Sequence, residues 1–146
     1  MPTQIQAILA DKGDRVHTIG RDDDATRAAA RMKSLGIASL VVTENTRVVG
    51  LVGERDIMLA VADNAASITS LTVNDVMQKQ PETCKPTDRI HEVMETMTRK
   101  RRRHIPVVDD DGSLCGIVSI GDMVKFRLHQ MELETRVLRD AYLTKH

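Results

Sequence analysis

Two aspartates at equivalent places in a repeated motif are the residues of this chain best suited to bind a ligand. The segment from Gly50 to Asp56 returns in similar form from Gly116 to Asp122, and each copy leads from an apolar strand into a helical stretch. The unpaired N–H groups of a helix N-terminus attract phosphate, and a carboxylate one turn in can accept both hydroxyls of a ribose. The motif therefore indicates nucleotide binding, although the S-x-x-D spacing at Ser119 is also that of an ordinary capping box.

Other chemistries have less support in the sequence. The five histidines show no spacing with cysteine or carboxylate that would build a metal site. Ser119 has no His-Asp partner system that would make it a nucleophile. Cys84 and Cys115 form no CxxC pair, and two isolated cysteines suit a reducing cytosol. We therefore expect no catalytic residue, no metal site and no catalytic cofactor.

Composition narrows the range of partners. Lys plus Arg and Asp plus Glu both number 21, so the net charge of zero provides no bulk attraction to nucleic acid or anionic lipid. One Phe, one Tyr and no Trp cannot supply base-stacking platforms, which argues against a nucleic-acid role. No stretch approaches the roughly 18 apolar residues that span a bilayer, and the N-terminus lacks the pattern of a signal peptide. The expectation is a soluble, cytoplasmic protein without a membrane partner.

The elements that must position the two aspartates recur with an offset of about 65 residues. Thr18 corresponds to Thr83, Met32 to Met97 and Val42 to Val107, so two units of about 60 residues are expected to pack on each other. We assign residues 1–66 to a first unit with its lead helix and residues 67–128 to a second unit with its lead helix. Residues 129–146 are assigned to a C-terminal helical extension. The small and polar segment 62–71 is the expected linker.

Each unit is expected to fold as β-α-β-β-α, which makes the protein α+β. Apolar residues at helical spacing mark helices over 25–35 and 90–97, each with one apolar stripe. Short lead helices are expected over 5–9 and 73–77. Strands are expected at residues 16–19, 39–43, 48–52, 83–84, 104–108 and 114–118, with a hairpin in each unit.

The motifs taken together resemble a known family. The closing G-h-h-S-x-x-D, the strand Ile105-Pro106-Val107 before it and the T-x-x-P-x-D of Thr83 to Asp88, in tandem duplicate, resemble the CBS domain, named after cystathionine beta-synthase. The resemblance covers nearly the whole chain and is strongest to stand-alone bacterial CBS-pair proteins. It implies a Bateman module, in which two units pack about a pseudo-twofold axis and leave two clefts. Family members bind AMP, ADP, ATP, NAD(H) or S-adenosylmethionine in such clefts.

The resemblance also implies which residues form each cleft. In cleft one, Asp122 would bind ribose, Ser119 and Gly121 would lie near phosphate, and the base would be surrounded by Thr18, Ile19, Ala38, Ser39 and Leu40. In cleft two, Asp56 would bind ribose, Arg55, Arg103 and His104 would bind phosphate, and the base would lie among Thr83, Cys84, Ile105 and Pro106. The rest of the basic run, Lys100 to Arg102, is assigned to solvent.

The sequence departs from the family pattern at two places. Gly53 stands where the family usually has Ser or Thr, and Val41 stands where it usually has Pro. Glycine is an acceptable N-cap, but it brings no hydroxyl group to a ligand. Cleft one is therefore expected to be the better-formed site.

The C-terminal segment carries a hypothesis about self-association. Apolar or small residues spaced 3, 4, 3 and 4 follow one side of a helix expected over 122–145: Leu128, Met131, Thr135, Leu138 and Tyr142. Two heptads are too short for an independent coiled coil. The segment is expected either to pack on its own module or to supplement a homodimer.

The expected function is that of a non-enzymatic sensor. The module would bind adenine nucleotides such as AMP, ATP or NAD(H), as in energy sensing, and would signal to an unidentified partner protein through a conformational change. One alternative is a structural adaptor with degenerate clefts. Another is an enzyme that processes a nucleotide.

Overall fold

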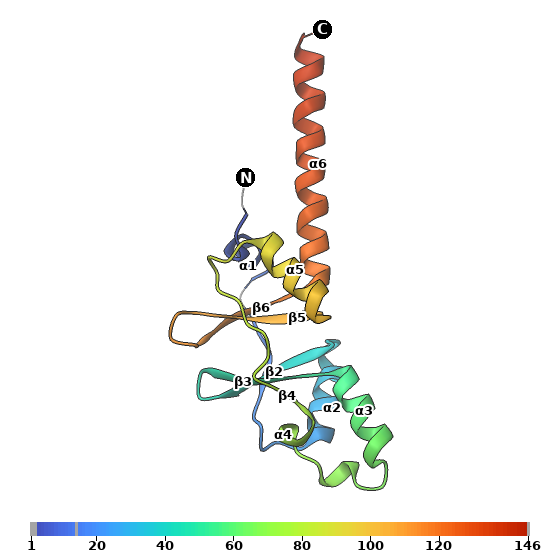
Figure 1. The fold of residues 1–146 in the computed structure, drawn as a ribbon. Coiled ribbons are helices and arrows are strands. Elements are labelled where there is room, and N and C mark those ends of the chain that lie inside the picture. Colours follow the sequence, from blue (N-terminus) through green and yellow to red (C-terminus); the bar gives the residue numbers. More distant parts are fainter. Residues whose placement is uncertain (1–2, 14, 146) are drawn as a thin grey trace.

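The computed structural model describes residues 3–13 and 15–145, which form two α+β units stacked one on the other (Figure 1). The first unit consists of β1 (Thr18–Ile19), α2 (Ala25–Leu35), β2 (Ser39–Glu44), β3 (Arg47–Gly53) and α3 (Glu54–Asn64). The second unit consists of α5 (Ile90–Lys100), β5 (His104–Val108), β6 (Leu114–Ser119) and α6 (Ile120–Lys145). The predicted mixed fold of two related units is confirmed.

The remaining segments are short. They are α1 (Ile5–Lys12), the 3-10 turn η1 (Ile68–Ser70), α4 (Val73–Val76) and β4 (Gln78–Lys79). The expectation of a linker over 62–71 is wrong in part, because α3 continues through Asn64 and η1 gives the rest of the segment a regular turn.

Each unit is built around an antiparallel hairpin, β2–β3 in the first and β5–β6 in the second. In the first unit β1 pairs with β2 in parallel at one edge of the sheet, and β4 pairs with β3 at the opposite edge. The strand expected at residues 83–84 is reduced to one parallel bridge between Cys84 and Val107. Two backbone bonds hold that bridge, from Cys84 N to Pro106 O at 3.0 Å and from Val108 N to Cys84 O at 2.8 Å.

The two helices before the hairpins bury most of the apolar stripes that the sequence predicts, although Leu35 at the end of α2 is exposed. Helix α2 buries Ala25, Ala28 and Met32, and α5 buries Ile90, Val93 and Met97. These side chains pack with inward-facing strand residues such as Leu40 and Val107, because alternate residues of a strand face the same side. Each unit therefore has its own apolar core.

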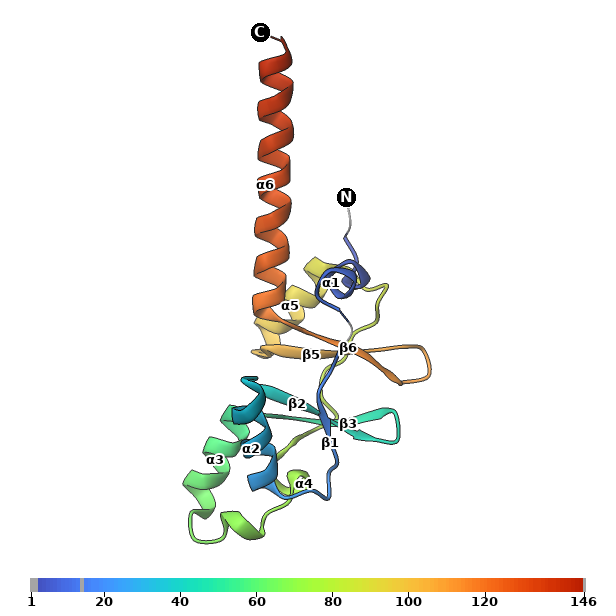
Figure 2. The ribbon, with the colours of Figure 1, turned by 180° about the vertical axis from the view of Figure 1, so that it is seen from behind.

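The lead helices cross over between the units. Ile5, Ile8 and Leu9 of α1 pack in the core of the second unit, and Val73 of α4 packs in the core of the first. Matching backbone bonds fix each crossover: Ile5 N donates to Asp88 O at 2.9 Å, and Val73 N donates to Asp23 O at 2.8 Å. Figure 2 shows α1 beside the second unit and α4 beside the first. Each core thus draws on both halves of the chain. The unit boundaries assigned along the sequence remain predictions.

The two hairpins lie side by side, and their turns touch at the same edge of the molecule (Figure 1). Leu114 N donates to Thr46 O at 2.9 Å, and the hydroxyl oxygens of Thr46 and Ser113 lie 3.3 Å apart. Helix α6 extends well beyond the body of the module (Figures 1 and 2). The stacked hairpins thus bring the ends of β3 and β6, and the aspartates that follow them, to the space between the units.

Candidate functional site

The N-terminus of α6 has a complete capping box. Ser119 N donates to Asp122 Oδ2 at 2.9 Å, and Asp122 N donates to Ser119 Oγ at 3.1 Å. These reciprocal bonds hold the carboxylate at the first turn of the helix and satisfy two backbone donors. Asp122 is therefore fixed in place before any ligand arrives.

The equivalent N-terminus of α3 has half of that box. Gly53 N donates to Asp56 Oδ2 at 2.8 Å, but glycine has no side chain to return the bond. A Cβ at position 53 would lie 3.4 Å from Ala38 O and 3.7 Å from Asp56 Oδ2, which is ordinary contact. The backbone would thus accept a serine here.

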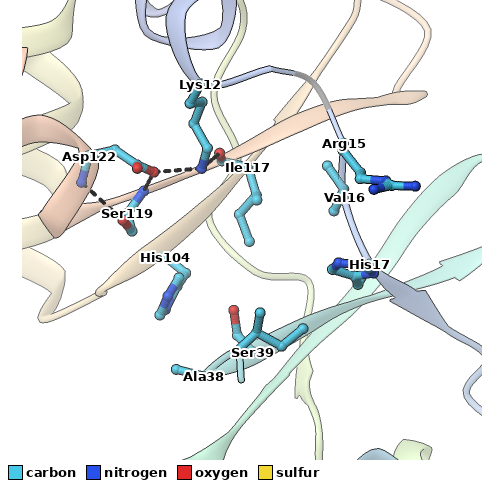
Figure 3. Close-up of a pocket in the computed structure, with 11 residues that line it drawn as sticks. Lys12, Arg15, Val16, His17, Ala38, Ser39, His104, Ile117, Ser119 and Asp122 are labelled. Carbon is cyan, nitrogen blue, oxygen red and sulfur yellow. Dashed lines mark hydrogen bonds and ion pairs between the residues drawn. The ribbon is translucent and has the colours of Figure 1, made fainter. Parts of the chain in front are cut away.

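Asp122 faces a cavity of about 340 Å³ between the units, which corresponds to cleft one (Figure 3). Its walls come from the end of α1 and the segment before β1, the start of β2, the start of β5, the end of β6 and the first turn of α6. They are formed by Lys12, Arg15, Val16, His17, Ile37, Ala38, Ser39, His104, Ile117, Ser119 and Asp122. The cavity thus combines the carboxylate of Asp122 with the cationic side chains of Lys12 and Arg15.

Lys12 is tied to the cleft-one carboxylate. Its Nζ donates to Asp122 Oδ2 at 2.7 Å and to Ile117 O at 2.9 Å, as Figure 3 shows. Burial raises the pKa of Asp122, but the bonds from Lys12 and Ser119 N and the charge of Lys12 outweigh it, so the pKa lies below its usual value. The carboxylate is therefore ionised at neutral pH, with Lys12 as its counter-ion.

The structure brings together part of the set predicted for cleft one. Ala38, Ser39, Ser119 and Asp122 line the cavity. Ile19 and Leu40 instead lie in the core of the first unit, and Leu40 alternates along β2 with Ser39, which lines the cavity. The carbonyl of Thr18 accepts a hydrogen bond from Arg31, and Gly121 lies exposed on the first turn of α6. The sequence analysis did not assign three lining residues to this cleft: Lys12, Arg15 and His17. Their position just before β1 was a signal that they lie near the cleft edge of the sheet.

Asp56 faces a second cavity, of about 370 Å³, which corresponds to cleft two. It is lined by Ala38, Ser39, Leu51, Gly53, Glu54, Arg55, Asp56, Gln78, Arg101, Arg102, Arg103 and His104. Burial raises the pKa of Asp56 above its usual value, against the opposing effects of Gly53 N, the Gln78 side chain and the charges of Arg102 and Arg55. The half-buried carboxylate of cleft two is thus less well compensated than that of cleft one.

Three consecutive arginines enter cleft two from the turn between α5 and β5. Arg101 adopts the left-handed conformation at φ 55° and ψ 45°, and Arg102 N donates to Met97 O at 2.9 Å. The assignment of Arg102 to solvent is wrong, because it lines the cleft with a buried Nε atom, whereas Arg101 is exposed and also borders the cleft. Lys100 lies apart, with its Nζ 3.3 Å from Glu82 Oε1.

The structure divides the set predicted for cleft two. Arg55, Asp56, Arg103 and His104 line it. Thr83, Cys84 and Ile105 border a separate cavity of about 180 Å³ beside α5, and Pro106 is fully buried. Burial, assisted by the charge of Asp88, raises the pKa of Cys84 to about 12, so this thiol behaves as a small apolar group. Gln78, which the sequence analysis missed, reaches the cleft because β4 adds to the edge of β3.

Three residues, Ala38, Ser39 and His104, line both cavities. Burial lowers the pKa of His104; Lys12 and Arg103 add to this effect, and Asp122 and Glu54 oppose it. The imidazole is therefore neutral at neutral pH and separates the two clefts. A charged group bound in either cleft would lie near the same ring.

The described residues lack two features that other functions would need. Among residues 3–13 and 15–145, no group of three His, Cys, Asp or Glu side chains is arranged to hold a metal ion. In the same residues, no helix is both long enough and apolar enough to cross a membrane.

Two related α+β units with a cavity on each side of a shared wall form a paired-domain module. A family profile described as CBS domain matches residues 12–63 and 73–129, and the chain belongs to the CBS-domain family. The resemblance inferred from the motifs is thereby confirmed as a tandem CBS pair.

Known proteins agree with this assignment. The CBS-domain protein ATU1752 of Agrobacterium tumefaciens is 37% identical, with a TM-score of 0.79 over 86% of this chain and 99% of that one. The CBS-domain protein PAE2072 of Pyrobaculum aerophilum, solved in complex with AMP, is 27% identical, with a TM-score of 0.77 over 90% of this chain and 98% of that one. The mitochondrial CBS domain-containing protein CBSX3 of Arabidopsis thaliana is 33% identical over 84% of this chain, which spans 61% of that relative.

Proposed function

We propose that this CBS pair is a regulatory module that binds adenine nucleotides such as AMP, ADP, ATP or NAD(H). One observation carries the proposal: each of two clefts between the units holds a helix-N-terminal aspartate opposite cationic side chains. A related protein has been crystallised with AMP, which supports an adenosine-type ligand. The aspartates, Asp122 and Asp56, would accept the ribose hydroxyls.

The proposed signal is a change in the packing of the two units. Each cleft has walls from both units, so a bound nucleotide would stabilise one relative arrangement of them. A ligand shifts such an equilibrium only by its difference in affinity for the two arrangements, typically about 1–3 kcal/mol. A partner protein would then distinguish the two shapes, and the module would act by binding rather than by catalysis. Its two free cysteines suit the reducing cytosol as the proposed location.

Thermal unfolding in the presence of nucleotides tests the proposal. A ligand at 100 times its dissociation constant adds about 2.7 kcal/mol to the free energy of unfolding, which raises the melting temperature. We expect the shift to shrink in Asp122→Asn and in Asp56→Asn, and to vanish in the double variant. Asp75→Asn is the matched control, because Asp75 also accepts a capping bond from its N-cap, Thr72 N at 2.8 Å, but lines neither cleft.

The same experiment separates the alternative functions. An adaptor with degenerate clefts would show no shift with AMP, ADP, ATP, NAD+, NADH or S-adenosylmethionine. A nucleotide-processing enzyme would convert the added nucleotide, which chromatography of the incubated mixture would reveal. Either result would contradict the proposed sensor.

We also propose that two copies associate through α6. Several large apolar side chains on this helix are more than half exposed, among them Leu128 (55%), Met131 (52%) and Leu138 (71%). In a parallel pair in which these residues form the seam, Arg127 would face the partner's Glu132 and Glu134 would face the partner's Arg139. Both flanking pairs carry opposite charges, which favours a second copy of the chain as the occupant.

Light scattering coupled to size-exclusion chromatography tests the dimer. Leu138→Glu places a charge on the seam and is expected to shift the protein toward the monomer. Val137→Glu places the same charge one residue away, at a side chain that is 66% exposed and off the seam, and is expected to leave the mass unchanged. A wild-type protein that is monomeric at micromolar concentration would refute this part of the proposal.

A further inference from the structure

We propose that the two clefts select different ligands: cleft two takes a nucleotide with two or three phosphates, and cleft one takes a nucleoside monophosphate. Arg102 is the residue that sets this preference, in the turn that it shares with Arg101 and Arg103. The inference rests on the proposed nucleotide binding and adds the number of phosphates to it.

The turn before the central hairpin has the same backbone conformation in both units, but its side chains are uncharged in the first unit and cationic in the second. In the first unit Gly36 is left-handed at φ 66° and ψ 36°, and Ile37 N donates to Met32 O at 3.0 Å. In the second unit Arg101 and Arg102 repeat both features. The series Gly36-Ile37-Ala38 thus corresponds to Arg101-Arg102-Arg103. Cleft one has two apolar residues from its turn, where cleft two has cationic ones.

Arg101 occupies its position against the conformational preference of its residue type. A left-handed backbone suits glycine, and a side chain with a Cβ is disfavoured there. The first unit has glycine at the corresponding place, so the fold itself does not require arginine. A residue kept in an unfavourable conformation at the mouth of a cleft is consistent with a ligand contact.

Unsatisfied polar atoms also point to cleft two. Within the described residues, the buried side-chain nitrogen and oxygen atoms without a hydrogen-bond partner are Arg102 Nε and Gln78 Oε1, and both residues line this cleft. A buried donor without a partner is costly, and a phosphate oxygen would satisfy Arg102 Nε. A guanidinium also presents its donors in a planar fork that matches phosphate oxygens.

The cations of cleft one are less available. Lys12 already neutralises Asp122 at 2.7 Å, which leaves Arg15 as the other lining side chain with a fixed positive charge. One guanidinium suits a single phosphate group. In cleft two, the three arginines of the turn and Arg55 face two carboxylates, Glu54 and Asp56. The charge balance therefore favours a longer phosphate chain in cleft two.

Calorimetric titration with AMP and with ATP tests the inference when one cleft is disabled at a time. Asp122→Asn isolates cleft two, where we expect ATP to bind at least 10-fold more tightly than AMP. Asp56→Asn isolates cleft one, where ATP should bind no more tightly than AMP. In the Asp122→Asn background, Arg102→Ala should reduce ATP affinity about 10-fold and leave AMP affinity within about 3-fold. Arg99→Ala, which removes a nearby arginine that does not line the cleft, should change neither.

A second variant guards against a loss of binding caused by misfolding. Arg101→Gly relieves the left-handed strain, so its melting temperature should rise while its ATP affinity falls. Equal affinities of AMP and ATP for isolated cleft two would overturn the inference and leave the proposed nucleotide binding intact. An equal loss of AMP and ATP affinity in Arg102→Ala would also overturn it. Failure of the unsubstituted protein to bind any nucleotide would overturn both.

Discussion

Cleft one and cleft two start from equivalent backbone and differ in the side chains that face the cavity. Cleft one has a complete capping box, an aspartate paired with Lys12 and an apolar turn at Ile37 and Ala38. Cleft two has a glycine cap, a less compensated aspartate and a turn of arginines. The residues that build the two cores remain apolar in both units. Divergence between the units is thus concentrated where a ligand would be recognised.

The structural glycines of the two units offer the largest test of this comparison. Gly50 in β3 and Gly116 in β6 occupy equivalent strand positions. Gly50 lies against Met77 and Gln78, just after α4, and Gly116 lies against Leu9 of α1. A Cβ at Gly50 would lie 2.3 Å from Met77 Sδ and 3.0 Å from Gln78 O, whereas one at Gly116 would lie 2.8 Å from Leu9 Cδ2. We expect Gly50→Ala to cost about 2–3 kcal/mol of unfolding free energy and Gly116→Ala about 1 kcal/mol, because Leu9 can rotate and a backbone carbonyl cannot.

Urea denaturation of the two glycine variants measures these costs. Gly112→Ala is not a suitable control, because Gly112 has a φ of 87° and would add backbone strain. Gly121→Ala is suitable, since its Cβ would meet Ser119 Oγ at 3.6 Å. A larger loss for Gly116→Ala than for Gly50→Ala would show that the α4 crossover, against Gly50, yields to an added methyl group more easily than the α1 crossover, against Gly116.

The capping boxes give the next largest effect. Ser119→Ala removes the hydroxyl that accepts the Asp122 N–H and is expected to cost about 1 kcal/mol. Gly53→Ser adds the missing hydroxyl and is expected to stabilise α3 by a few tenths of a kcal/mol. Thermal melts of both variants without ligand would show whether the caps differ as the hydrogen bonds indicate. Destabilisation by Gly53→Ser would mean that the contact with Ala38 O is too tight for a side chain.

The Lys12–Asp122 ion pair predicts a smaller change. Both side chains keep partial exposure, 31% for Lys12 and 22% for Asp122, so Lys12→Met should cost at most about 1 kcal/mol. The same variant should weaken nucleotide binding in cleft one and leave cleft two unchanged. Titration of Lys12→Met in the Asp56→Asn and Asp122→Asn backgrounds measures the two effects separately. Equal losses in both clefts would show that Lys12 acts through the packing of the units.

The smallest effect concerns the shared wall. Burial lowers the pKa of His104 below its usual value of 6.5, so the unfolded chain binds more protons than the folded one near this pH. The contribution of His104 to stability is therefore complete above about pH 6.5 and is lost as pH falls through the window below it. Denaturation midpoints from pH 5 to 8 should fall less steeply at low pH in His104→Gln. Bound phosphate should raise the pKa of His104, so nucleotide binding should take up protons.

Several features of the fold followed from the sequence because they depend on local periodicity. The apolar stripes of α2 and α5 were predicted from residue spacing, and most of their side chains are buried, whereas Leu35 at the end of α2 is 42% exposed. Both hairpins lie within about two residues of their predicted ends, since apolar runs interrupted by a polar turn define them. The strand at residues 83–84 was overestimated, because pairing along one edge of β5 supports a single bridge there.

The candidate site could be predicted in part. Asp56 and Asp122 were found from their recurrence, and the structure places each in a separate cavity. Arg101, Arg102 and Gln78 could not be placed, because their approach to cleft two depends on a left-handed turn and on the pairing of β4 with β3. Lys12 could not be assigned to Asp122, since the two residues are 110 positions apart.

The sequence by itself determined that the chain is a tandem repeat, that its helices have apolar stripes and that two aspartates lie in the first turns of equivalent helices. The tertiary structure decided which surfaces those elements cover. Ile5, Ile8 and Leu9 had to be buried somewhere, but the hydrophobic effect has no direction and did not specify the core of the second unit. The crossover of α1, fixed by bonds such as that from Ile5 N to Asp88 O, brings Lys12 to Asp122 and so creates one of the contacts in which the two clefts differ.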